Sequence, residues 1–500
     1  MSQPARRVQE FLAAPRSMFV AGRWGDALSG ARLDSLDPAT GRVLTSIPAG
    51  DEHDVDVAVR AARAALDDPR WRDLSPMDRG RLLDRLADLV EENADELALL
   101  EAYDNGKPVG VARAVDVGTT VKLFRYFAGW PSKFEGSTIP VSPRGGLKVL
   151  NYTVHEPVGV VAAVVPWNFP MSMASWKLAP ALAMGNAVVL KPAEITSLST
   201  LRLAELIDEA GFPPGVVNVV TGRGAVAGAA LAAHDDVDKI AFTGSTAVGR
   251  QIARAATGNM KNVSLELGGK SPNIVLPDAD LAEVIAAATD AVFFNQGQVC
   301  TAGSRLYVHA DVYDEVMAGL VERTRRIVVG PGTDPATQMG PVVSAAQLAT
   351  VGEYLDLGRE QGATVLTGGG PVTGLGEDYA GGYFVAPTIF ADTDHTMRVV
   401  REEIFGPVLV AMRWTDTDEL VTLANDTPYG LSAGIWTRNL TDAHRLAGRI
   451  KAGTVWINCY NYTDPASPFG GYKQSGWGRE MGHAVLGSYT ETKSVWVNLS

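Results

Sequence analysis

Up to Pro108, the pattern of apolar and polar positions changes from one that predicts strands to one that predicts helices. Up to about residue 50 the sequence predicts short strands and turns, with an apolar stretch at 18–22 and a turn at 37–41. Two helical patterns come next. The first follows Asp54 and has an apolar face at helical spacing (Val55, Val59, Ala62 and Leu66). We expect Asp54 to cap the N-terminus of this helix. The second covers 82–100, where leucines recur near helical spacing, and Asn105-Gly106 with Pro108 should end it.

From residue 150 onward, short apolar runs alternate with segments of helix length. The runs are rich in β-branched residues and lie at 158–165, 187–190, 216–220, 239–242 and 273–276. Helical stretches at 200–210, 225–233 and 247–256 separate them. Strands buried on both faces and separated by helices indicate a parallel βαβ sheet. Such sheets bind ligands at the carboxyl ends of their strands.

A second series of the same kind follows Glu266. Residues 311–327 predict a helix, and 407–411, 454–457 and 495–499 predict strands. We therefore expect an α/β fold with two doubly wound parallel sheets, and a boundary within residues 267–270. The tail at 494–498 is apolar, so we expect it to pair with another segment or another subunit.

Composition narrows the class of protein. The chain has 500 residues, enough for two or three domains, and is 46% hydrophobic and 20% charged, as in globular proteins. Its formal charge of −13 makes nucleic acid and an anionic membrane poor partners. No signal peptide is expected, and no apolar run reaches the ~20 residues that span a bilayer. Only two cysteines are present, which favours a reducing, cytoplasmic compartment.

Two glycine turns compete as the nucleotide site. Residues 222–227 form a G-x-G-x-x-A turn between a predicted strand and helix, like the ordinary dinucleotide fingerprint. Residues 244–249 form a second strand-to-helix turn, in which Ser245 offers a hydroxyl beside the free N–H groups of a helix start. The alternative for either turn is an ordinary βα connection that binds no ligand. The residues alone do not choose between them.

A cation and a carboxylate follow the predicted strand at 187–190. Lys191 can pair with a phosphate or ribose oxygen, and Glu194 can accept from the hydroxyls of an adenine ribose. A carboxylate there repels a 2′-phosphate, which favours NAD over NADP. The alternative is a surface ion pair at a strand end.

Cys300 is the candidate nucleophile. Polar, glycine-containing sequence precedes it and small residues follow, as an approachable loop requires. The thiolate is the reactive form, so a base, a cation or a helix N-terminus must assist it. The alternative is a small buried hydrophobe, which is how we interpret Cys459 beside its tyrosines.

Two further polar residues lie at strand ends. Glu266 follows an apolar strand and precedes paired glycines, so burial can raise its pKa into the range of a general base. An ion pair with Lys270 is the alternative. Asn168 lies between two prolines after the strand at 158–165, where its amide can donate to an oxyanion, or simply form the turn.

Other catalytic classes lack their residues. None of the 7 histidines has metal-ligand spacing and C-x-x-C is absent, so no metal site is expected. A serine hydrolase lacks its G-x-S-x-G elbow.

Taken together and in order, these segments resemble the aldehyde dehydrogenase family over nearly the whole chain. The matching motifs are Pro-Trp-Asn-Phe-Pro (166–170), Lys-Pro-Ala-Glu (191–194), Phe-Thr-Gly-Ser-Thr (242–246), Leu-Glu-Leu-Gly-Gly-Lys (265–270), Gln-Gly-Gln-Val-Cys (296–300), Glu-Glu-Ile-Phe-Gly-Pro (402–407) and Pro-Phe-Gly-Gly-Tyr-Lys-Gln-Ser-Gly (468–476). The resemblance also chooses between the glycine turns: it puts the pyrophosphate at 244–249 and the Gly224 turn near the adenosine.

The resemblance implies roles residue by residue. Cys300 would be the nucleophile, Glu266 the general base, and Asn168 with the Cys300 N–H the oxyanion hole, while Lys177 and Glu480 would form a proton relay behind Glu266. The implied NAD-binding residues are Pro166, Trp167, Lys191, Glu194, Gly224, Gly244, Ser245, Gly249, Glu403 and Phe405. The implied aldehyde tunnel is lined by Phe169, Met173, Trp176, Val299, Thr301, Tyr462, Thr463 and Phe469. One position departs from the family: Thr463 stands where an aromatic residue is frequent.

The resemblance also implies an organisation and a substrate class. The expected division is a Rossmann-like NAD domain at 1–136 and 156–267, a catalytic domain at 268–476, and oligomerisation strands at 137–155 and 487–500 that build a dimer or tetramer. The expected reaction is NAD-dependent oxidation of an apolar or aromatic aldehyde such as phenylacetaldehyde. Betaine-type or medium-chain aldehydes, a CoA-acylating relative, a hydrolase that does not use NAD, and a non-catalytic protein are the alternatives.

Overall fold

The computed structural model describes residues 2–500 and contains two large sheets, each parallel at its centre. The first has the order β18-β10-β9-β6-β7-β8-β1-β2. Its strands are β18 (Gly476–Trp477), β10 (Asn262–Glu266), β9 (Lys239–Thr243), β6 (Val160–Val164), β7 (Ala187–Lys191), β8 (Val217–Val219), β1 (Met18–Val20) and β2 (Arg23–Gly25). The run from β10 to β8 is parallel, and antiparallel strands complete both edges. The expected α/β class is confirmed.

The second sheet is built in the same way from later residues. Its order is β13-β14-β15-β12-β11-β16-β17, with only β13 antiparallel. The strands are β13 (Thr364–Thr367), β14 (Thr388–Ala391), β15 (Val408–Trp414), β12 (Arg305–His309), β11 (Pro272–Val275), β16 (Ser432–Trp436) and β17 (Thr454–Ile457). The chain passes between the sheets in residues 267–271, and β18 later returns to the first sheet. The proposed domain limits stay a prediction.

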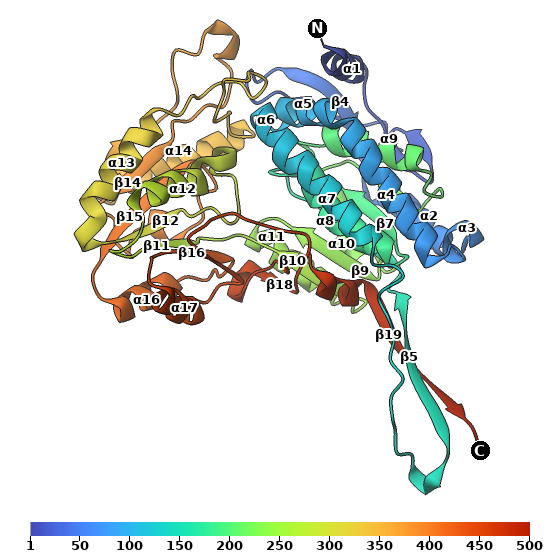
Figure 1. Ribbon diagram of the computed structural model, residues 1–500. Coiled ribbons are helices and arrows are strands. Elements are labelled where there is room, and N and C mark those ends of the chain that lie inside the picture. The colour runs from blue at the N-terminus through green and yellow to red at the C-terminus, as the bar shows by residue number, and fades with distance from the viewer. Residues whose placement is uncertain (1) are drawn as a thin grey trace.

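Helices cover both sheets, which lie side by side in Figure 1. Around the first sheet they are α1 (Gln3–Leu12), α2 (Glu52–Asp67), α3 (Pro69–Arg72), α4 (Pro76–Glu92), α5 (Ala94–Asp104), α6 (Val109–Val111), α7 (Gly118–Ala128), α8 (Pro170–Ala183), α9 (Leu198–Ala210), α10 (Ala229–Ala233) and α11 (Thr246–Ala256). Two π-helical turns, η1 (Ala112–Val117) and η3 (Gly224–Gly228), precede α7 and α10. Around the second sheet they are α12 (Leu281–Phe293), α13 (Tyr313–Arg325), α14 (Ala345–Glu360), α15 (Arg398–Arg401), α16 (Thr417–Asn425) and α17 (Leu440–Arg449).

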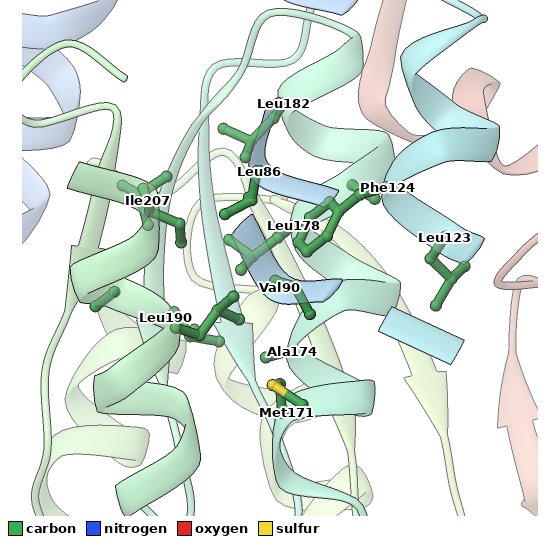
Figure 2. Packing of buried hydrophobic residues seen from close by; sticks show 14 of the residues in the cluster. Leu86, Val90, Leu123, Phe124, Met171, Ala174, Leu178, Leu182, Leu190 and Ile207 are labelled. Atoms are coloured by element: carbon green, nitrogen blue, oxygen red, sulfur yellow. The ribbon is translucent and has the colours of Figure 1, made fainter. Parts of the chain in front are cut away.

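A close-packed interior lies between helices and the first sheet. Figure 2 shows Leu86, Phe124, Leu178 and Leu190 from α4, α7, α8 and β7 gathered in one apolar cluster. All of them are completely buried. Because such interiors are packed to crystal-like density, this cluster fixes α8 firmly against the sheet.

Three local expectations are corrected by the structure. The N-terminal stretch contains α1, whose Val8, Phe11 and Leu12 are buried, in addition to the expected strands. Asp51 is the cap of α2, because it accepts from the N–H groups of His53 and Asp54, while Asp54 returns a bond to Asp51 N. The leucine pattern at 82–100 is two helices, α4 and α5, which meet at Asn93.

A two-stranded arm leaves the body of the molecule. Antiparallel strands β5 (Val149–Pro157) and β19 (Thr490–Asn498) form it, and the C-terminus lies along it (Figure 1). A smaller antiparallel pair joins β3 (Arg32–Leu36) to β4 (Val43–Pro48). Within residues 2–500, no helix has the length and apolarity needed to cross a bilayer.

Candidate active site

A cavity of about 340 Å³ opens at the carboxyl ends of the first sheet's strands, beside residues of the second sheet's half. It brings together Cys300, Glu266 and Asn168. Of the other predicted residues it also contains Pro166, Trp167, Gly244, Ser245, Glu403, Phe405, Phe169, Met173, Trp176, Val299, Thr301, Thr463 and Phe469. Parallel strands end at one edge, so residues distant in sequence meet there.

Cys300 follows a strained turn. Asn295, Gln296 and Gly297 have φ values of 48°, 60° and 70°, three successive left-handed residues, two of which are not glycine. A Cβ on Gly297 would lie 2.1 Å from the carbonyl oxygen of Gly406, so no larger residue fits. Strain of this kind, which costs about 1–3 kcal/mol per non-glycine residue, persists only where the surrounding structure imposes it.

The thiol of Cys300 is neutral in this setting. Burial, followed by the nearby carboxyl groups of Glu403 and Glu266, raises the pKa of Cys300 to about 12. A base must therefore accept its proton before the sulfur can act as a nucleophile.

Asn168 lies in the loop between β6 and α8, and one of its amide hydrogens is bonded within the protein. Its Nδ2 donates to the carbonyl oxygen of Gln298 at 2.9 Å, on the loop that carries Cys300. An amide nitrogen has two hydrogens, and Asn168 lines the cavity, so the second hydrogen remains for a bound group. The arrangement suits an oxyanion donor next to the Cys300 backbone N–H.

Glu266 ends β10 and is buried, yet neither of its carboxylate oxygens has a hydrogen-bond partner. Burial first, and then the charge of Glu480, raise its pKa well above the usual range, while Lys177 and Arg479 act in the opposite direction. A buried carboxyl without structural partners has no stabilising role in the fold, which is typical of a group kept for proton transfer.

Lys177 and Glu480 lie behind Glu266 and outside the cavity lining. Lys177 Nζ contacts Glu480 Oε1 at 2.6 Å and donates to Thr243 Oγ1 at 2.7 Å. Both side chains are completely buried or nearly so. The charges of both residues act on Glu266, but neither forms a hydrogen bond with it, so the relay stays a prediction.

Lys191 and Glu194 stand at the end of β7, beyond the cavity lining. Lys191 Nζ donates to Glu194 Oε2 at 3.1 Å, and Gly224 N donates to Glu194 Oε1 at 3.2 Å. Burial opposes ionisation of Glu194, but the Lys191 charge and these bonds prevail and hold its pKa below the usual value. Glu194 is therefore an ionised acceptor at neutral pH.

The two glycine turns differ in their position relative to the cavity: the turn at 244–249 reaches it, and Gly224 does not line it. The cavity reaches Gly244 and Ser245, and Ser245 caps α11 by accepting from Val248 N at 3.3 Å. A Cβ on Gly249 would lie 2.5 Å from Leu267 Cδ2, so a larger residue there would displace the Leu267 side chain, which lines the cavity. The turn at Gly224 opens into a π-helical turn and a short helix instead.

Glu403 and Phe405 line the same cavity as Gly244 and Ser245, and they come from the segment before β15 of the second sheet. Glu403 Oε1 accepts from Gly269 N at 2.9 Å, and burial raises the pKa of Glu403 to about 7. Phe405, with a φ of 56°, packs edge-on against Trp167 at 5.2 Å between ring centroids.

Tyr462 is the predicted tunnel residue that the cavity does not contain. Its side chain is 74% exposed, and its neighbours Asn461 and Thr463 line the cavity instead. Asn461 has a φ of 58° and accepts from Thr301 Oγ1 at 2.8 Å. Tyr460 is buried and donates to the Thr301 carbonyl oxygen at 2.9 Å, so it supports the wall rather than forming it.

Sequence reasoning missed several lining residues. They are Val115, Thr119, Ser172, Thr243, Leu267, Gly268, Phe294, Gln347 and Asn461. Val115 lies in the π-helical turn η1 and Thr119 in α7, so α-helical spacing does not predict that both reach the cavity. Phe294 stacks near Phe169 at 6.2 Å between centroids. Among residues 2–500, no lysine, arginine or histidine contributes to this lining.

Comparisons with known proteins agree with this geometry. The model of the "Aldehyde dehydrogenase family" matches residues 24–495. A Bacillus subtilis (strain 168) protein, DhaS, named provisionally as an aldehyde dehydrogenase, is 51% identical over 99% of this chain and 98% of its own. The human mitochondrial aldehyde dehydrogenase is 48% identical over 96% of this chain and 92% of its own.

Solved structures give the same result for the fold. The NAD⁺ complex of aldehyde dehydrogenase from Bacillus cereus superposes with a TM-score of 0.95, at 49% identity over 99% of both chains. A family model that matches nearly the whole chain, together with relatives of this identity, leaves one assignment. This chain belongs to the aldehyde dehydrogenase family.

Proposed function

We propose that the protein oxidises an aldehyde to the carboxylic acid with NAD, through a thioester on Cys300. The observation that carries the proposal is the meeting of Cys300, Glu266 and Asn168 in one cavity. The solved relative from Bacillus cereus is described as an NAD⁺ complex, which supports the same cofactor here.

The donor set fits a dinucleotide. Lys191 with ionised Glu194 would hold the adenine ribose, the start of α11 at Ser245 would meet the pyrophosphate, and Glu403 would hold the nicotinamide ribose. When bound, NAD supplies the acceptor for the hydride that leaves the aldehyde carbon. The charge of Glu194 is placed to repel a 2′-phosphate, so we assign NAD rather than NADP.

In the first half of the reaction the chain makes a covalent adduct. The Cys300 thiol gives up its proton to one of the two carboxylates close to it, Glu403 or Glu266, and its sulfur attacks the aldehyde carbonyl carbon. The second amide hydrogen of Asn168 and the Cys300 N–H stabilise the oxyanion that forms. Loss of hydride from this adduct leaves a thioester on Cys300.

In the second half, the acid is released. Glu266 accepts a proton from water, the water oxygen attacks the thioester carbonyl, and the Cys300 sulfur departs with its bonding electrons. The charges of Lys177 and Glu480 act on Glu266, and we propose that Glu266 turns toward this pair to pass its proton onward. The sum is aldehyde, NAD⁺ and water to acid, NADH and a proton.

We propose a neutral, apolar aldehyde as the substrate, with phenylacetaldehyde as the first choice. Phe169, Trp176 and Phe469 line the substrate side of the cavity, and Trp176 packs edge-on against Phe469 at 5.1 Å. Among residues 2–500, no lysine, arginine or histidine lines the cavity to bind a substrate carboxylate. Aromatic walls of this kind suit an arylalkyl group.

A panel of aldehydes tests the proposal directly. Phenylacetaldehyde, hexanal, betaine aldehyde and succinic semialdehyde would each be assayed with NAD and with NADP by absorbance of the reduced cofactor. We expect the highest kcat/KM for phenylacetaldehyde with NAD and the lowest for succinic semialdehyde. A preference for betaine aldehyde would move the substrate to the betaine type, and no reduction with any aldehyde would remove the proposal.

Replacing Glu194 by glutamine is expected to weaken the preference for NAD. Removal of the negative charge ends the repulsion of the 2′-phosphate, so kcat/KM with NADP should rise about 10-fold, roughly 1.4 kcal/mol, while that with NAD falls. The exposed Glu209 of α9, changed to glutamine, is the control. An unchanged NADP-to-NAD ratio would show that Glu194 does not contact the ribose.

We also propose that the arm of β5 and β19 joins copies of the chain into a dimer or tetramer. Apolar side chains are uncovered there: Trp496 in β19 is 56% exposed, and Leu499, the residue after β19, is 60% exposed. Exposed apolar patches on projecting strands typically mark contact with another chain. Light scattering that gives the mass of one chain would contradict this.

The proposal includes a cytoplasmic location. Cys300 and Cys459 are both free thiols, and a thiol nucleophile is preserved in a reducing compartment. Fractionation of the producing cells, with recovery outside the cytoplasmic fraction, would contradict it.

A further inference from the structure

A buried ionic cluster that the mechanism does not use lies directly behind Asn168. Lys107 is completely buried, and its Nζ contacts Asp116 Oδ1 at 2.8 Å and Glu101 Oε2 at 3.5 Å. Asp104 is buried close by. Burial, in the first place, raises the pKa values of Asp104 and Asp116 well above normal. Burying charges is costly, so a cluster of this kind needs a reason beyond stability.

The third polar contact of Lys107 is with the backbone of Asn168, the candidate oxyanion donor. Its Nζ donates to the carbonyl oxygen of Asn168 at 2.9 Å, across 61 residues of sequence. Asn105 Nδ2 donates to the carbonyl oxygens of Trp167 at 2.8 Å and Asn168 at 3.4 Å. Lys107 and Asn105 therefore fix the backbone of Asn168, the residue whose side-chain amide is the candidate oxyanion donor.

The same network reaches the loop of the nucleophile. Asn295 Nδ2 donates to the Asn168 carbonyl oxygen at 3.1 Å and to that of Gln298 at 3.3 Å. Asn168 Nδ2 also donates to the Gln298 carbonyl oxygen. One set of hydrogen bonds therefore joins the Asn168 amide to Gln298, two residues before Cys300.

The cluster also fixes the helix that follows Asn168. Glu101 Oε1 accepts from Met171 N at 3.0 Å, in the first turn of α8. Lys107 Nζ lies 4.3 Å from the ring centroid of Phe169, a wall of the cavity. Asp116 comes from the π-helical turn η1, and such turns are frequent at functional sites.

We infer that Lys107, assisted by Asn105, is a positioning residue that sets the Asn168 amide against the Cys300 N–H in the oxyanion hole. It touches neither substrate nor cofactor and acts through Asn168. The inference rests on the proposed aldehyde oxidation. A displaced donor matters because a shift of about 1 Å can cost up to about 10²-fold in rate.

Lys107→Met is the direct test, with phenylacetaldehyde and NAD as the probes. We expect kcat to fall about 10-fold to 10²-fold, with the Kd for NAD, measured by quenching of tryptophan fluorescence, unchanged. Asn168→Ala alone should lower kcat by about 10²–10³. Because Lys107 acts through Asn168, the double variant should lie within about threefold of Asn168→Ala.

Lys261→Met is the matched control. Lys261 is likewise buried, and its Nζ donates to the backbone carbonyl oxygens of Ala232 and His234 at 2.8 Å, away from the cavity. It should lower the thermal midpoint while leaving kcat within about twofold. If Lys107→Met does not fold, Asn105→Ala replaces it: this variant removes hydrogen bonds to the same backbone, and it is combined with Asn168→Ala in the same double-mutant comparison.

The outcomes separate the inference from the proposed function. A parent enzyme that reduces NAD with the aldehyde, together with Lys107→Met and Asn168→Ala effects that multiply, would overturn the inference alone. Full activity of Lys107→Met would do the same. A parent enzyme without activity on any aldehyde would remove the proposed function itself.

Discussion

Replacing Cys300 by alanine is expected to abolish NADH formation with every aldehyde, a loss of roughly 10⁴-fold or more. The sulfur forms the bond from which hydride departs, and no other lining residue offers a comparable nucleophile at the end of the strained 295–297 turn. Stopped-flow absorbance measures the first turnover as well as the steady state. Mass spectrometry of the parent, quenched during turnover, should show an acyl adduct on the peptide that contains Cys300.

Cys459→Ala is the control for this variant. Cys459 is a free thiol outside the cavity, so its loss should leave kcat within about twofold. The Kd for NAD should be near the parent value in Cys300→Ala, because the Lys191–Glu194 pair is untouched. Turnover retained by Cys300→Ala, with intact NAD binding, would show that the sulfur is not the nucleophile.

Much of the candidate site is readable in the sequence because its residues follow strands directly. Asn168, Lys191 and Glu266 lie at or just after the ends of β6, β7 and β10. Strands buried on both faces read as continuous apolar runs, so a polar residue at the end of such a run lies at the carboxyl edge of the sheet. Only the order of several motifs, however, distinguished a dinucleotide site from ordinary βα turns.

The rest depends on backbone detail that periodicity does not encode. In the 458–463 loop, Asn458 and Asn461 have φ values of 53° and 58°. Each left-handed residue turns the chain and changes which side chain faces inward. Asn461 therefore points to the cavity and Tyr462 to solvent, contrary to the expected lining.

Lys107 was missed for a related reason. Its partners Glu101, Asp116 and Asn168 come from a helix, a π-helical turn and a strand end, and a π-helical turn shifts the register of a helical pattern by one residue. No local rule predicts that four such residues meet. Contacts across 61 residues of chain become visible only in the packed structure.

Replacing Glu266 by glutamine is expected to separate the two halves of the reaction. Glutamine keeps the shape of the side chain but accepts no proton from water, so deacylation should slow by about 10²–10⁴. Formation of the acyl-enzyme needs the sulfur, the oxyanion donors and an acceptor for the thiol proton, and Glu403 remains in the cavity as that acceptor. Rapid mixing should therefore show a burst of one NADH per site followed by very slow turnover, with the thioester accumulating on Cys300.

The pH dependence gives this prediction a second readout. The pKa of Glu266 lies well above its usual range, so at low pH the carboxyl is protonated and cannot serve as a base. The deacylation rate of the parent should rise with pH as Glu266 ionises, and the residual rate of Glu266→Gln should lose that rise. Lys177→Met should change the midpoint of the parent profile, because Lys177 favours ionisation of Glu266 and its removal moves the midpoint to higher pH. A Glu266→Gln enzyme that releases acid at the parent rate, with the parent pH profile, would exclude Glu266 as the base and leave the unpartnered buried carboxyl without a role.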